Sequence, residues 1–139
     1  MGRTISRYYD DTETQMRPSE IIKKEAEKHG LDSTKVLVSI QYILTHKLGF
    51  LLTKGNSVLL LAKIGDNEYE THLFTEDSPL KLAQAMISIF HDIEKLNIKA
   101  IYGNADNPQI INLLKKLADK EGTEIQDPDK PNYNWMIRL

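Results

Sequence analysis

The stretch HLFTEDSPLKLAQAM, residues 72–86, joins two different patterns through a very short linker. Its first residues continue an alternation of apolar and polar side chains that is typical of a β-strand. Leu82 and Met86 then begin a spacing of three to four residues, which is typical of a helix that packs on one face. Ser78 can cap this helix, and Pro79 suits the first helical position because an N–H has no helical partner there. The stretch therefore predicts a strand that runs directly into a helix, as in α/β proteins.

The segments before this stretch predict three strands in succession. Residues 50–53, 58–64 and 69–75 are rich in apolar side chains. The turn-forming residues at 54–56 and 65–67 separate them. Because connections this short join neighbouring antiparallel strands, we expect an antiparallel meander.

Further elements on both sides complete the order. Pro18 opens a helix over residues 19–29, and a second helix, capped by Asp32 or Ser33, ends before Gly49. Downstream, the pattern predicts in order the helix after Ser78, a buried strand at 99–102, a helix capped by Asn107 or Asp106, and closing strands at 123–126 and 133–139. This order predicts an α/β (α+β) fold: N-terminal helices, an antiparallel meander, then helix, strand and helix in alternation, and two closing strands on one mixed sheet.

The composition is ordinary for a globular chain. The 139 residues are 40% apolar and 27% charged, and the formal net charge is −2. This balance gives no electrostatic reason to expect nucleic acid as a specific ligand, and no apolar run is long enough to span a membrane. The absence of cysteine excludes disulfides and thiolate chemistry. We therefore expect a single domain over residues 18–139, preceded by an extended polar arm at 1–17.

Two other stretches resemble a known family. Asn107-Pro-Gln-Ile-Ile-Asn-Leu-Leu-Lys-Lys-Leu-Ala118 is similar to the late helix of the GNAT acetyltransferases. Ile98-Lys-Ala-Ile-Tyr-Gly-Asn104 is similar to the splayed fifth strand that precedes that helix. With the order of elements, the resemblance covers residues 50–139. It implies a GNAT-like fold and, for an active member, acetyl-coenzyme A as the acetyl donor.

The coenzyme signature of the family is missing from the matching positions. The resemblance places the pyrophosphate-binding turn at residues 77–83, where the family has glycines that let backbone N–H groups approach the phosphates. This chain has no glycine in that stretch. Pro79 removes one N–H donor, and Glu76 and Asp77 place negative charge beside the helix start. We therefore expect no bound cofactor.

The acid and base of the family are not evident either. The resemblance places the tyrosine that protonates the coenzyme thiolate at Leu114. Glu68 or Glu70 could supply a carboxylate base, but alternation along an exposed strand face accounts for both residues without catalysis. Tyr102 and Tyr133 are expected to pack as aromatic strand residues. We therefore expect no catalytic residue and predict that the chain is not an enzyme.

The histidines do not indicate a metal site. A zinc site needs three or four converging ligands, and the sequence positions of His29, His46, His72 and His91 suggest no such set. Loop acids such as Asp129 lack the spacing of a calcium-binding loop. We expect no bound metal ion.

The polar arm indicates a role in assembly. We expect Arg3, Arg7, Tyr8, Tyr9 and Arg17 to contact a partner protein. As a small, cysteine-free, GNAT-like protein, this chain is loosely similar to virion-associated proteins of tailed bacteriophages. This resemblance implies a non-catalytic structural protein, such as a portal or tail ring subunit that contacts copies of itself. Its location would be the virion if a phage encodes it, and the cytoplasm otherwise.

Two other functions stay open. One is an acetyl-coenzyme A-dependent N-acetyltransferase with a divergent coenzyme site. The other is a small phage-encoded regulator that binds a host protein. Coenzyme binding distinguishes the first from the rest, and the oligomeric state separates a regulator from a ring subunit.

Overall fold

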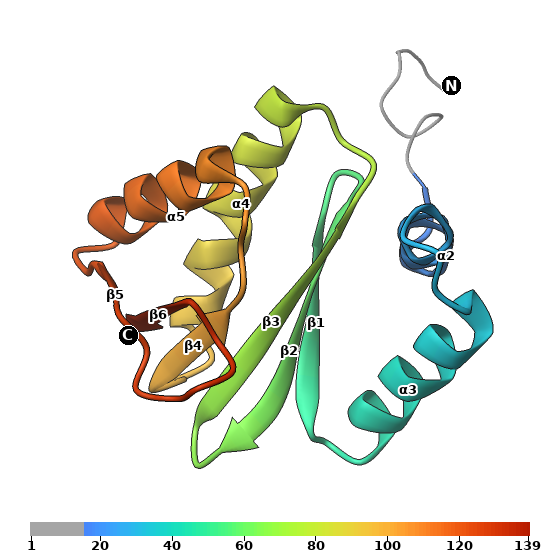
Figure 1. Cartoon of the computed structure of the whole chain (residues 1–139), viewed down its shortest axis with the longest axis horizontal. Coiled ribbons are helices and arrows are strands. Elements are labelled where there is room, and N and C mark those ends of the chain that lie inside the picture. The colour runs from blue at the N-terminus through green and yellow to red at the C-terminus, as the bar shows by residue number, and fades with distance from the viewer. Residues whose placement is uncertain (1–15) are drawn as a thin grey trace, which may run out of the picture.

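A six-stranded mixed sheet lies between two pairs of helices (Figure 1). The computed structural model describes residues 16–139. The strand order is β1-β2-β3-β4-β6-β5. Helices α2 and α3 cover one face over the first strands, and α4 and α5 cover the opposite face. Among residues 16–139, no helix is long and apolar enough to cross a membrane.

The first helical pair consists of α2 (Pro18–Lys28) and α3 (Ser33–Thr45). The Asp32 carboxylate accepts hydrogen bonds from the N–H groups of Thr34 and Lys35, so it caps α3. The apolar sides of both helices pack on the sheet and form a small core with these buried members: Ile21, Ile22, Ile40, Val58 and Leu60.

The predicted meander is confirmed. It comprises β1 (Gly49–Lys54), β2 (Ser57–Gly65) and β3 (Glu68–Thr75), and both neighbouring pairs are antiparallel. The first half of β2 is buried on both of its faces, because helices cover the sheet on either side there. Its run of apolar residues therefore shows no alternation.

The second half of the chain follows the predicted alternation. It contains α4 (Pro79–Glu94), β4 (Ala100–Gly103) and α5 (Pro108–Lys120). Two closing strands, β5 (Ile125–Gln126) and β6 (Trp135–Arg138), complete the sheet. Both are shorter than the sequence predicts, because the residues before β6 form a loop that bonds to the chain after β4.

The larger core lies between the sheet and the pair α4 and α5. It contains the predicted apolar stripe of α4, and its members from α4 and the sheet include Leu82, Met86, Ile89, Phe90, Ile93, Leu59, Leu61, Ile101 and Ile137. Burial of one large apolar side chain stabilises a fold by about 1.5–3 kcal/mol. This core therefore contributes more to stability than the smaller one under α2 and α3.

The ladder between β3 and β4 is short. The strands run parallel and pair only over residues 68–70 and 100–102. Beyond this point the chain after β4 bonds to the β5–β6 loop instead. The Asn134 N–H donates to the Gly103 carbonyl, and the Asn134 side chain bonds both the N–H and the carbonyl of Ala105. The two strands therefore part while β3 is still extended.

We expect the substitution Gly49→Ala to destabilise the fold by about 1–3 kcal/mol, because a Cβ there would overpack a closed contact. The added atom would lie 2.2 Å from the Leu61 carbonyl oxygen and 2.7 Å from Cγ2 of Ile43. Urea unfolding followed by the fluorescence of the single tryptophan measures the change.

The matched control is Gly30→Ala. Gly30 has a φ of +70° but open space around it, so alanine meets only backbone strain of about 1 kcal/mol. Equal losses in the two variants would contradict a steric origin at Gly49.

Candidate functional site

The parting of β3 and β4 leaves a slot in the middle of the sheet. The Asn67 carbonyl accepts from the Lys99 N–H, and the Thr75 N–H donates to Glu25. Because backbone groups alternate along a strand, the N–H and C=O of Leu73 also face the side away from β2. Among residues 16–139, no strand pairs with this part of β3, since the ladder with β4 ends at Glu70. The slot therefore presents an extended backbone edge.

Hollows on both faces of the sheet meet at this slot. An apolar cavity of about 80 Å³ lies on the side of α4 and α5. A groove of about 1000 Å³ lies on the other side. Residues that border both hollows are Thr71, Leu73, Asn104, Ala105 and Ile110. The two hollows are therefore adjacent, with these residues between them.

Gly103 permits the close packing at the base of the slot. A Cβ on this residue would lie 2.3 Å from the Trp135 ring and 2.7 Å from the Thr71 hydroxyl oxygen. The Thr71 hydroxyl itself donates to the Tyr102 carbonyl at 3.1 Å. The slot is thus bounded at its closed end by a tight junction of β3, β4 and β6.

The groove has polar side chains on its floor and its rim. Glu70 and His72 lie on β3, Tyr133 comes from the β5–β6 loop, and Lys35 and Ser39 come from α3. The side chain of His72 is 49% exposed and that of Glu70 is 28% exposed. A ligand in the groove can therefore reach both.

Glu70, His72 and Tyr133 form one hydrogen-bonded group. The Tyr133 hydroxyl donates to Oε1 of Glu70 at 2.6 Å, and Nε2 of His72 contacts the other carboxylate oxygen. Burial pushes the pKa of the Glu70 carboxyl up, but the hydrogen bonds from Tyr133 and His72 outweigh it and leave the pKa lowered. Burial, and then the bond to Glu70, raises the pKa of Tyr133 to about 12. The group therefore holds a carboxylate and a protonated phenol beside an accessible imidazole.

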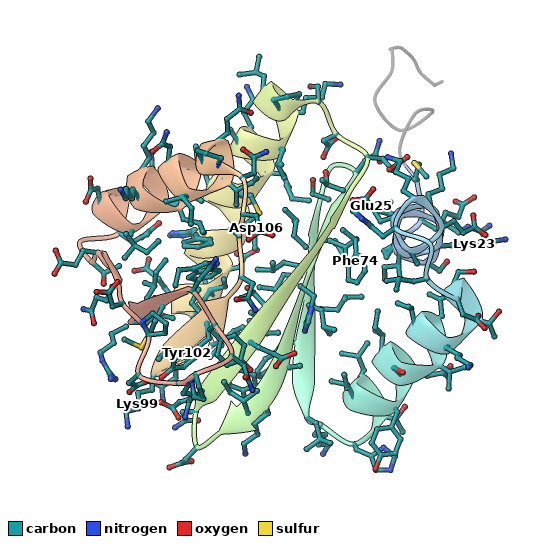
Figure 2. All side chains as sticks on the ribbon, in the orientation of Figure 1. Lys23, Glu25, Phe74, Lys99, Tyr102 and Asp106 are labelled. Atoms are coloured by element: carbon teal, nitrogen blue, oxygen red, sulfur yellow. The ribbon has the colours of Figure 1, made fainter. Side chains whose placement is uncertain are left out.

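A second network fixes the loop that carries Tyr133. The buried Tyr102 hydroxyl lies 2.7 Å from Oδ1 of Asp129 and 3.1 Å from Oε2 of Glu68. Burial and these two carboxylates raise the pKa of Tyr102. Arg138 pairs with Asp129 at 3.1 Å, and Lys130 pairs with Glu68 at 3.3 Å. Tyr102 lies beneath the loop in Figure 2, so the network ties the loop to β3 and β4.

Ser78 and Pro79 form the N-terminal cap and the first position of α4. Ser78 caps the helix by accepting from the Lys81 N–H at 3.4 Å, and Pro79 occupies the first position, which confirms the prediction from the opening stretch. The two acids before the helix do not face its axis. Asp77 accepts from the Asn56 N–H in the β1–β2 turn at 3.0 Å and from the Ser57 hydroxyl at the start of β2 at 2.7 Å.

Glu76, the other acid at this junction, turns toward α2. It pairs with Lys28 at 2.5 Å, and Lys28 also lies 3.2 Å from Glu25. The hydrogen bond from Lys28 lowers the pKa of Glu76. Both acids beside the helix start are therefore bonded to neighbouring elements, and the helix start lacks the glycines of a phosphate-binding turn.

The roles predicted for several residues need correction. Glu70 is a partly buried member of a hydrogen-bonded group, and not only an exposed strand residue. Tyr133 points its hydroxyl at Glu70 from outside the sheet, so it is not a strand residue. Leu114, by contrast, needs no correction, because it is buried and lines the apolar cavity. The alternation of Glu68, Glu70 and His72 on one face was the sequence signal for this group.

Most of the predicted partner-binding arm lies outside the described residues. This applies to Arg3, Arg7, Tyr8 and Tyr9. Arg17 is described, and its backbone N–H donates to the Glu20 side chain at the start of α2. Contact of the arm with a partner protein or with further copies of the chain stays a prediction.

Comparison with solved structures identifies the fold. A GNAT-family acetyltransferase from Staphylococcus aureus Mu50 is similar over 87% of this chain and 92% of that chain, with a TM-score of 0.53 and 12% sequence identity. A Bacillus subtilis acetyltransferase in complex with CoA covers 71% of this chain and 80% of that chain, with a TM-score of 0.35 and 18% identity. No protein-family model matches the chain, and a search of curated proteins gives no match. The chain has a GNAT-like fold.

This likeness corrects the prediction that the chain is not an enzyme. The missing glycines led to that prediction, but the solved structure that shares the fold over most of both chains is an acetyltransferase. The resemblance to bacteriophage virion proteins gains no support from the comparisons. The GNAT resemblance is supported at the level of the fold.

We expect the stability of the protein to fall as the pH rises above about 10. A raised pKa in the folded state adds stability that is complete below the ordinary value of 10.0 and is lost as the pH rises toward about 12 for Tyr133. One such group changes the free energy of unfolding by at most about 1.4 kcal/mol per pH unit. Tyr102 acts in the same direction.

The variant Tyr133→Phe isolates this contribution. At pH 8 we expect a loss of about 1 kcal/mol, because one hydrogen bond to Glu70 disappears. Between pH 10 and pH 12 its unfolding free energy should fall less steeply than that of the wild type. Urea unfolding at each pH provides the measurement, and parallel curves for the two proteins would contradict the assignment.

Proposed function

We propose that the protein transfers an acetyl group from acetyl-coenzyme A to an amine, with a coenzyme site that departs from the usual glycine-rich turn. The observation that carries the proposal is the slot between β3 and β4, which opens into a groove holding Glu70, His72 and Tyr133. The likeness of the fold to an acetyltransferase supports the same class of reaction.

The slot suits the pantetheine arm of the coenzyme. This arm is a narrow chain with two amide groups, which can bond to an extended backbone as a strand does. The edge of β3 at Leu73 would offer one N–H and one C=O to such a chain, and apolar residues that line the cavity, such as Phe90 and Leu113, would contact its methylene groups. The residues of the slot therefore fit this part of the coenzyme.

The pyrophosphate is expected to contribute less to affinity than in a glycine-lined site. Pro79 has no N–H, and the Lys81 N–H bonds to the Ser78 side chain. Fewer backbone donors remain at the start of α4 than a phosphate group can accept. Binding would therefore depend more on the slot than on the helix start.

The groove residues can handle the proton of the acceptor amine. Acetyl-coenzyme A would supply the acetyl group as a thioester. His72, in contact with Glu70, can accept a proton from an amine in the groove, and Glu70 stabilises the imidazolium that results. Tyr133 fixes the orientation of the Glu70 carboxylate. Leu114 lines the apolar cavity, and its hydrocarbon side chain cannot protonate the coenzyme thiolate that leaves, so water would supply that proton.

We expect coenzyme A to bind with a dissociation constant below about 1 mM, and we expect Ala105→Trp to abolish binding because the indole would fill the slot. Isothermal titration calorimetry measures both. Ile110→Trp blocks the same slot from α5 and provides a second variant if the first folds poorly.

The control for the added volume of an indole ring is Val38→Trp, which places the same ring on an exposed part of α3. It should bind coenzyme A as the wild type does. Absence of heat with the wild-type protein at coenzyme concentrations of about 1 mM would end the proposal.

We expect His72→Gln and Glu70→Gln to lower kcat by about 10²-fold or more while coenzyme affinity stays within about twofold, because both residues act on the amine. Release of the coenzyme thiol in the presence of a panel of primary amines gives the rate. The protein contributes no thiol to this assay, since it contains no cysteine.

His46→Gln serves as the matched control, since His46 follows α3 and contacts the Tyr42 ring outside the groove. Its rate should equal that of the wild type. Rates for the two groove variants that match the wild type would remove His72 and Glu70 from the reaction.

A further inference from the structure

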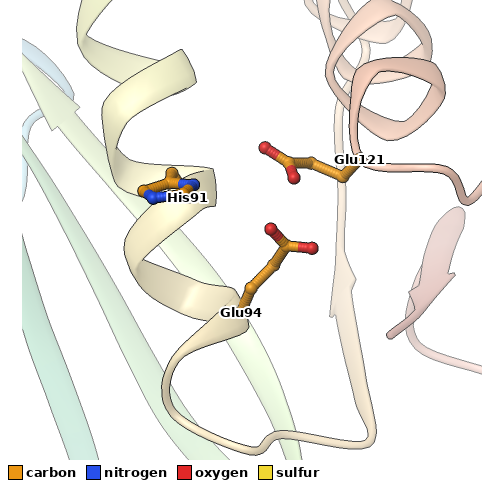
Figure 3. A group of neighbouring side chains, drawn as sticks. All are labelled: His91, Glu94 and Glu121. Atoms are coloured by element: carbon orange, nitrogen blue, oxygen red, sulfur yellow. The ribbon is translucent and has the colours of Figure 1, made fainter.

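A separate cluster of side chains that could hold a metal ion lies where α4 and α5 end. His91 and Glu94 belong to the last turn of α4, and Glu121 follows the end of α5. Each offers one ligand atom, and these atoms all lie within 4.8 Å of one another. Figure 3 shows the imidazole and the two carboxylates directed toward a common space between the helices.

The charges around this space favour a cation. Glu94 is the last residue of α4, and Glu121 is the C-cap of α5. Helix C-termini carry partial negative charge, so two helix ends and two carboxylates converge here. The nearby Lys95 pairs with Asp92 at 4.0 Å on its own helix turn. Two carboxylates this close repel one another unless a positive charge lies between them.

We propose that His91, Glu94 and Glu121 bind a divalent transition-metal ion such as Zn²⁺, with water completing the coordination. Imidazole nitrogen together with carboxylate oxygen suits zinc, whereas Mg²⁺ and Ca²⁺ prefer ligand sets made of oxygen alone. Ligand atoms on one tetrahedral zinc ion lie about 3.4 Å apart. His91 and Glu94 are exposed, so small rotamer changes can bring the three ligands to that spacing.

The bound ion would join the ends of two helices that cover the larger core. The site lies at the opposite end of α4 from Ser78, where the strand enters the helix beside the slot. The ion would therefore stabilise the packing of α4 and α5 without touching the groove. This proposal is independent of acetyl transfer.

The sequence contains part of this signal. His91 and Glu94 are three residues apart on a helix, which places them on one side, but the expectation of no metal site did not use this pair. Glu121 comes from the next helix, so only the packing of α4 against α5 brings the third ligand to them.

The test is thermal unfolding of the untagged full chain with ZnCl₂, with MgCl₂ and with a chelator. We expect zinc to raise Tm by about 9 °C when free zinc exceeds Kd about a hundredfold, and magnesium to leave Tm unchanged. Calorimetry should give one zinc ion per chain. No zinc-dependent rise in Tm, or an equal rise with magnesium, would overturn the proposal.

Variants locate the site. His91→Ala and Glu121→Gln should each abolish the zinc-dependent rise in Tm, whereas Asp92→Asn, on the same turn of α4, should keep it. Glu94→Gln should raise Tm in the chelator, because it removes repulsion with Glu121, and should also abolish the response to zinc. A full zinc response in His91→Ala and Glu121→Gln would place the ion elsewhere and overturn the assignment.

Discussion

The early end of the ladder between β3 and β4 is the constraint on which the rest of the structure depends. Backbone N–H and C=O groups in a sheet need partners, and a strand that leaves its neighbour must find others. On the β4 side the partners come from the β5–β6 loop, where Asn134 bonds to Gly103 and Ala105. On the β3 side, no strand of the described part of the chain pairs with the edge at Leu73. One strand is thus satisfied by a loop while the other keeps an open edge, and the slot follows from this difference.

The same loop explains why the groove has polar walls. Helices α2 and α3 cover the first strands on their face of the sheet, but the face of β4 and β6 is covered by the loop. A loop cannot supply a continuous apolar surface, and it is attached here by hydrogen bonds and ion pairs around the buried Tyr102 hydroxyl. These bonds also place Tyr133 over Glu70. The candidate site therefore forms only when the loop is attached to the sheet.

The missing glycines concern only one part of the proposed coenzyme site. They bear on how closely a phosphate can approach the start of α4, and the Ser78 cap agrees with that conclusion. They carry no information on the slot or on the hydrogen-bonded group of Glu70, His72 and Tyr133 in the groove. The two acids that seemed to oppose an anion are bonded instead to the β1–β2 turn and to α2. The absence of these glycines therefore does not exclude catalysis.

The sequence by itself determined the order of the elements, the Ser78 cap of α4 and the antiparallel meander, and it narrowed the caps of α3 and α5 to two residues each. These features depend on contacts between residues two to four positions apart, or across short turns, and such contacts are visible in the spacing of side chains. Only the tertiary structure decided where the strands part, which way Asp77 points, and which distant residues meet. Tyr133 and Glu70 are 63 positions apart, and His91 and Glu121 belong to different helices. These pairs come together because of the path of a loop and the packing of two helices on a sheet. Local sequence patterns do not predict either of these.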